Sequence, residues 1–179
     1  ATLCNLSPDL DLSEWHCYID ETLDVFHPTE LNVHDSHQLF TDHLKAVPNG
    51  SPYPRLVPAN DTALTAIIEN RNRDAYREMI KNIAEKIVSP RYDCFTLGSK
   101  YEQLIERKGK KQMLYCISVL SPRVIATFGG ATVFSARFEE SLHYHLWQRE
   151  GVTWEQDADL TRHLRFTEHV GHEMTKIYW

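Results

Sequence analysis

The run from Met113 to Leu120 constrains the fold of this chain more than any other stretch. Apolar side chains occupy both of its alternating faces, which is typical of a strand that is covered on two sides. A second β-rich run spans Val124–Phe128, and Gly129-Gly130 is a two-residue hairpin signal in front of Ala131–Phe138. The sequence therefore predicts a three-stranded antiparallel meander at the centre of the fold.

The next segment, Glu139–Gln148, fits two patterns. Leu142 and Leu146 lie at helical spacing, but the segment also alternates strictly, with Tyr144 on the same strand face as these two leucines. Turn-forming residues on both sides favour the strand. We therefore expect an α+β fold in which a small antiparallel sheet, over residues 111–155, is packed with flanking helices.

Periodicity predicts those helices. The most regular amphipathic pattern runs from Tyr76 to Ile87, with apolar residues three and four apart. Residues 9–26 and 35–47 are also expected to be helical, so that residues 1–47 form an acidic helical segment. Four prolines within residues 48–60 predict an extended connector that holds no helix and no central strand. Residues 61–179 then form the α+β core, and a chain of 179 residues suits one compact domain overall.

The charges of the chain are segregated. Residues 1–44 contain nine acidic residues and no Lys or Arg, whereas residues 45–123 carry 14 Lys and Arg against eight acids. An acidic surface of this kind can engage a basic protein, such as one that handles nucleic acids, through complementary potential. This predicts a partner-binding accessory or inhibitor-type protein, of the sort that suits a mobile element. The candidate contact residues are Asp9, Asp11, Glu14, Asp20, Glu21 and Asp24.

A metal-dependent enzyme is the alternative. The chain has ten histidines, and His143, His145 and Glu150 would form a two-His, one-carboxylate face if the segment were a strand. This spacing resembles the first metal-binding motif of cupin barrels over eight residues, although Arg137 stands where that motif has a glycine. The resemblance implies a divalent transition metal as cofactor. His169 and His172, three apart, are a further candidate pair. Partner-paired or exposed histidines without any cofactor are the simpler interpretation.

A third hypothesis is nucleic-acid binding through the basic middle of the chain. The helix that spans residues 71–86 and the turn at residues 107–111 both carry cationic side chains, which can release counterions from phosphate. The simpler interpretation of the turn is an exposed loop that keeps one end of the sheet soluble. The candidate residues in the turn are Arg107, Lys108, Lys110 and Lys111.

Compartment is predicted from what the sequence lacks. The chain has no run of about 18 apolar residues that would span a membrane, and its first 12 residues lack the features of a signal peptide. Its four cysteines form no C-x-x-C pair, which favours reduced thiols over a disulfide framework. We therefore expect a cytoplasmic protein with no membrane partner.

Overall fold

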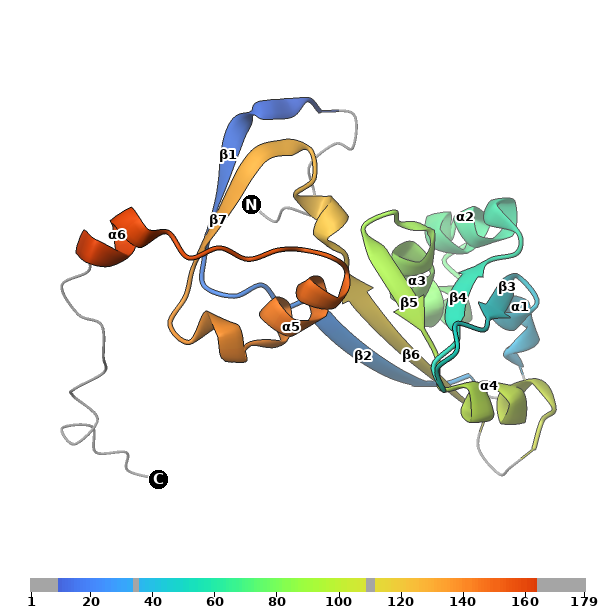
Figure 1. Cartoon of the computed structure of the whole chain (residues 1–179). Coiled ribbons are helices and arrows are strands. Elements are labelled where there is room, and N and C mark those ends of the chain that lie inside the picture. Colours follow the sequence, from blue (N-terminus) through green and yellow to red (C-terminus); the bar gives the residue numbers. More distant parts are fainter. Residues whose placement is uncertain (1–9, 34–35, 109–111, 164–179) are drawn as a thin grey trace, which may run out of the picture.

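The chain folds around an antiparallel sheet with helices packed against it (Figure 1). A separate pair of strands, residues 12–20 with residues 128–134, extends from that body, and we call this pair the ribbon. The structure is a computed structural model that describes residues 10–33, 36–108 and 112–163. Its strands are β1 (Leu12–Asp20), β2 (Phe26–Asn32), β3 (Leu44–Val47), β4 (Arg55–Pro58), β5 (Tyr92–Phe95), β6 (Met113–Leu120) and β7 (Phe128–Phe134). Its α-helices are α1 (Gln38–Thr41), α2 (Asp61–Glu69), α3 (Ala75–Val88), α4 (Gly98–Ile105), α5 (Leu142–Arg149) and α6 (Ala158–His163), and short 3-10 turns are η3 (Pro122–Val124) and η4 (Phe138–Glu140).

The main sheet has five strands in the order β2-β6-β5-β4-β3, and every neighbouring pair is antiparallel. The α+β class and the antiparallel sheet flanked by helices are therefore confirmed. The sheet is larger than expected from residues 111–155, because β2, β3, β4 and β5 come from earlier in the chain. The predicted strand at Met113–Leu120 is β6, and it lies between β2 and β5.

The main core lies between one face of this sheet and the helices. Helix α3 buries Ile80, Ile83 and Ile87 there, as its periodicity predicted. The N-terminus of α3 is fixed by the Asp74 carboxylate, which accepts a hydrogen bond from the backbone N–H of Arg77. Burying an isoleucine side chain stabilises the fold by about 1.5–3 kcal/mol, so this helix face is a principal attachment to the sheet.

A second core cluster forms at the end of the sheet, below the ribbon in Figure 1. Trp147 of α5 is fully buried against Val25, Leu120 and Val124. Its indole Nε1 donates a hydrogen bond of 2.7 Å to the backbone oxygen of Leu120. Leu120 ends β6 and Val25 precedes β2. This cluster therefore packs α5 against the two segments that connect the main sheet to the ribbon.

The acidic helical segment predicted for residues 1–47 is wrong for its described part. Residues 12–20 form β1 and residues 26–32 form β2, and the helix expected over 35–47 shortens to α1 followed by β3. Leu12, Trp15 and Ile19 do have helical spacing, but pairing with distant strands satisfies their backbone groups instead. β2 and β3 share one sheet with β5 and β6, so this segment does not stand apart from the core.

The prediction that residues 48–60 contain no central strand is also wrong. β4 lies inside the sheet, between β3 and β5. The strand is only four residues long, and it begins after Pro54 and ends at Pro58. The prolines therefore stand before it or at its last position, where the missing N–H costs the ladder least.

The predicted hairpin at Gly129-Gly130 does not form. Both glycines lie within β7, which pairs with β1 in parallel. The strand predicted over Val124–Phe128 does not form either, because Val124 ends η3, residues 125–127 are a turn and Phe128 is the first residue of β7. A side chain on Gly129 would overlap the backbone oxygen of Ser13, and one on Gly130 would lie 2.8 Å from Nδ1 of His16. The glycines therefore allow two strands to approach closely rather than reversing the chain.

Within the described residues, no helix combines the length and the hydrophobicity that are needed to cross a bilayer.

Candidate interaction surface

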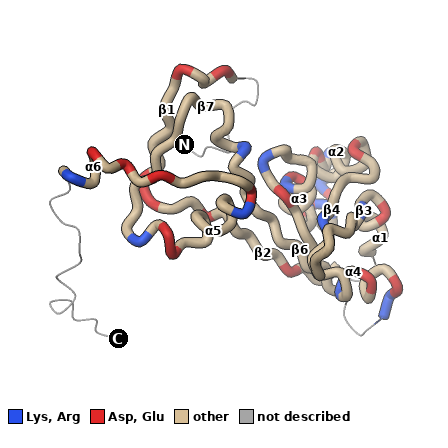
Figure 2. The backbone as a smooth tube through the Cα atoms, viewed as in Figure 1, with Lys and Arg blue, Asp and Glu red and all other residues tan. Residues whose placement is uncertain are grey.

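The predicted acidic contact residues lie at the two ends of β1. Asp11 and Glu14 are at its start, and Asp20, Glu21 and Asp24 are at its end or just beyond it; all five are exposed. Asp9 lies outside the described residues. Glu14 and Asp20 are six positions apart, a span of about 20 Å in a strand. Figure 2 shows the acidic positions at the start of β1 set apart from the body of the molecule. The carboxylates thus form two groups rather than one patch.

Internal cations do not neutralise these carboxylates. Among the described residues, none of the five forms an ion pair with Lys or Arg, and Asp24 has only His27 as a partner, at 3.6 Å. The backbone N–H of Ser13 donates to Asp11 at 3.0 Å and holds the pKa of that carboxyl below its usual value. Neither β1 nor β7 contains a Lys or Arg. The ribbon is therefore an anionic element.

Between the two acidic groups, one face of the ribbon carries exposed aromatic rings. Tyr18 of β1 is 69% exposed and stacks on Phe134 of β7, with ring centroids 6.0 Å apart and planes 20° apart. His16 lies 4.8 Å from Tyr18, and its Nε2 is 2.8 Å from Oγ1 of Thr132. We call His16, Tyr18, Thr132 and Phe134 the outer face of the ribbon.

The two faces of β1 differ in burial. Cys17 and Ile19 alternate with the outer-face residues and are buried, whereas Trp15, next to the irregular start of the β1–β7 pairing, is 67% exposed. Parallel strands are usually covered on both faces. A two-stranded parallel ribbon that exposes aromatic rings on one face therefore resembles a binding surface.

The metal site predicted from His143, His145 and Glu150 depended on a strand that does not form. These residues lie in and after helix α5, where Ser141 caps the helix by accepting the N–H of Tyr144. Side chains two apart on a helix point about 200° apart. His143 is accordingly buried, and His145 and Glu150 are exposed.

No three His, Cys, Asp or Glu side chains in the described parts of the chain are grouped so as to hold a metal ion. The other predicted ligands, His169 and His172, lie outside the described residues.

His143 instead packs in the core, where it accepts one backbone hydrogen bond. The backbone N–H of Leu23 donates to its Nδ1 at 3.3 Å, and aromatic rings surround it, with the Trp147 centroid at 4.2 Å and the Phe138 and Trp154 centroids at 5.3 and 5.6 Å. Burial lowers the pKa of His143 to about 4. The imidazole is therefore neutral at pH 7 and ties α5 to the segment between β1 and β2.

Two cationic side chains of the basic turn have hydrogen-bond or ion-pair partners within the protein. Arg107 donates to the side-chain oxygen of Gln38 at 2.7 Å, and the Lys108 ammonium lies 2.6 Å from the Glu106 carboxylate, which raises the pKa of that lysine. Lys110 and Lys111 lie outside the described residues. The described half of this turn offers one cation without an acidic partner.

Sequence reasoning identified the acids of the surface but missed its rings. Tyr18 and Phe134 meet because two strands more than 100 residues apart pair in register, and no local pattern marks that pairing. The alternation of His16, Tyr18 and Asp20 was the only available signal, and the competing helical spacing obscured it.

No family model, curated protein or solved structure matches this chain.

Proposed function

We propose that this chain binds a basic segment of a partner protein through the outer face of the β1–β7 ribbon and the carboxylates at its two ends. The observation that carries the proposal is the exposed Tyr18–Phe134 stack on a ribbon that has no Lys or Arg. A nucleic-acid-handling protein with a basic groove has the matching chemistry. Occupying such a groove would make this chain an inhibitor or accessory factor.

The rings and the acids would contribute differently. A guanidinium over an aromatic ring gains about 0.5–1 kcal/mol at an exposed site, and more when it is desolvated. An exposed ion pair contributes only about 0.2–1 kcal/mol. The carboxylates would therefore mainly steer a basic partner and raise its association rate, while Tyr18 and Phe134 supply the contact that slows dissociation.

Point substitutions test this, because removing residues 1–47 would take β2 and β3 out of the main sheet. Fluorescence anisotropy of a labelled, arginine-rich synthetic peptide measures binding to the intact chain. Tyr18→Ser is expected to weaken binding about tenfold, the loss that an anchoring aromatic side chain produces. Tyr53→Ser is the matched control, since Tyr53 is 43% exposed and lies outside the ribbon, in the loop between β3 and β4.

The acids are tested by charge reversal. Asp20→Lys with Glu21→Lys is expected to slow association and to flatten its dependence on salt, whereas Glu102→Lys on α4 should change it little. Equal peptide affinity in the wild type and the Tyr18→Ser variant would disprove the proposal. Tighter binding of duplex DNA than of the peptide would instead favour the basic turn as the functional surface.

A further inference from the structure

Apart from the ribbon, the main sheet contains a hollow where two of its strands separate. β4 and β5 pair only at Arg55↔Phe95 and Leu56↔Cys94, whereas β3–β4 and β5–β6 each pair over four residues. Beyond Leu56 the chain reaches Pro58, which has no N–H with which to extend a ladder. A hollow of about 330 Å³ opens at this separation.

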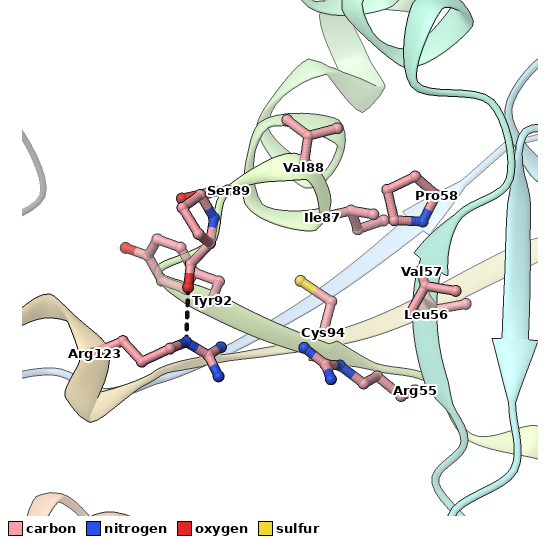
Figure 3. A pocket seen from close by; sticks show the side chains of 11 residues that line it. Arg55, Leu56, Val57, Pro58, Ile87, Val88, Ser89, Tyr92, Cys94 and Arg123 are labelled. Carbon is pink, nitrogen blue, oxygen red and sulfur yellow. Dashed lines mark hydrogen bonds between the residues drawn. The ribbon is translucent and has the colours of Figure 1, made fainter. Parts of the chain in front are cut away.

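The two sides of the hollow differ in chemistry. Figure 3 shows Val57, Pro58, Ile87 and Val88 along its upper and right-hand sides, and the guanidinium groups of Arg55 and Arg123 pointing toward one another below. One wall is thus apolar, and the other is cationic. The volume of the hollow is at the small end of the range of about 300–1,000 Å³ that is typical of ligand sites.

A buried carboxylate holds the two arginines in place. The side chain of Asp93 in β5 is 7% exposed, and its two oxygens accept separately from Nη2 of Arg55 and from Nη2 of Arg123, the latter at 2.9 Å. Nε of Arg123 also donates to the backbone oxygen of Pro90 at 3.0 Å, the dashed line in Figure 3. Fixing the side chains in this way lowers the entropy that a ligand would have to remove.

The group retains both charge and donors. Two guanidinium groups against one carboxylate leave a net charge of about +1. Within the described residues, nothing accepts from Nε or Nη1 of Arg55 or from Nη1 of Arg123, and both side chains are about half exposed. Lys86 does not line the hollow, but its ammonium lies 5.7 Å from the centre of the ring of Tyr92, which does.

We propose that this hollow binds a small organic anion, with a phosphate or carboxylate group held between Arg55 and Arg123 and an apolar body against Val57, Pro58 and Val88. The planar fork of a guanidinium matches both kinds of oxyanion. An inorganic ion alone would leave the apolar wall without a contact. This site is independent of the ribbon and of its proposed basic partner.

Isothermal titration calorimetry with three probes of similar shape tests the proposal. Phenyl phosphate and benzoate carry the two anionic groups, and benzyl alcohol lacks the charge. We expect at least one of the anions to bind with saturation and at least tenfold more tightly than the alcohol, because charge-assisted hydrogen bonds to arginine are among the strongest in proteins. The tighter of the two anions identifies the head group.

Two variants locate the binding. Arg55→Gln removes one guanidinium, and Val88→Trp fills the hollow from its rim without altering a charge. Each should weaken binding of the preferred anion about tenfold or more, whereas Arg149→Gln on α5 removes the same charge elsewhere and should leave it unchanged. If Arg55→Gln fails to fold, Val88→Trp decides. Absence of anion binding, equal binding of the alcohol, or undiminished binding by Val88→Trp would each overturn the proposal.

Discussion

Acidification should destabilise this protein through His143. This residue is 1% exposed, and burial lowers the pKa of its imidazole to about 4. In the unfolded chain the same imidazole titrates near its ordinary value of about 6.5. Between these two pH values the unfolded state therefore binds a proton that the folded state does not. The contribution of His143 to stability is present above pH 6.5 and is lost as the pH falls toward 4.

The size of the effect follows from the difference between the two pKa values. A difference of about 2.5 pKa units, at about 1.36 kcal/mol per unit, corresponds to a loss of about 3 kcal/mol between pH 7.5 and 4. That is a large part of the stability of a typical domain, about 5–15 kcal/mol. Urea unfolding followed by tryptophan fluorescence at several pH values measures the free energy of unfolding across this range.

Carboxylates titrate in the same range, so the argument depends on a comparison of variants. His143→Gln removes the imidazole while retaining an acceptor for the N–H of Leu23, and His145→Gln is the matched control on the exposed side of the same helix. His143→Gln should be less stable at pH 7.5 but should lose about 3 kcal/mol less than the wild type on acidification. His145→Gln should keep the wild-type pH dependence. Identical pH dependence in all three proteins would refute the assignment of His143 as a buried neutral histidine.

Two further predictions concern packing. Ile83→Ala on the buried face of α3 should lower the free energy of unfolding by about 2–5 kcal/mol in urea titrations, while Met79→Ala, at a partly exposed position on the same helix, should cost far less; similar losses would contradict the burial of that face. Gly129→Ala should disrupt the pairing of β1 with β7, because its methyl group would overlap the Ser13 carbonyl. Hydrogen exchange should then speed up for backbone amides of β1 and β7 but not of β5 or β6, and unchanged protection in the ribbon would contradict the close approach of the strands.

Local pattern was sufficient where one element carries its own signal. The periodicity of Tyr76–Ile87 predicted α3, because a helix satisfies its backbone hydrogen bonds internally and needs only one apolar stripe to dock. The apolar run at Met113–Leu120 likewise predicted β6, which is paired on both sides. These two elements indicated helices packed against a sheet, whereas the antiparallel arrangement, which is correct for the main sheet, was predicted from a hairpin at Gly129-Gly130 that does not form.

Where two patterns coexisted, local signals gave the wrong answer. Residues 139–148 fit both a helix and a strand, and the burial of Trp147 one turn after His143, together with the Ser141 cap, decides for the helix α5. That result separates His143 from His145 and removes the basis of the predicted metal site. The group in which buried Asp93 joins Arg55 to Arg123 also could not be foreseen, because these three residues come from distant parts of the chain.

The sequence by itself determined the negative charge of the first 44 residues, since composition does not depend on folding. Only the tertiary structure decided how that charge is displayed. The backbone of β1 finds its hydrogen-bond partners in β7, more than 100 residues away, and this pairing places a stacked pair of rings between two groups of carboxylates. A strand, unlike a helix, depends on such remote partners, and for that reason the interaction surface could not be read from the residues that form it.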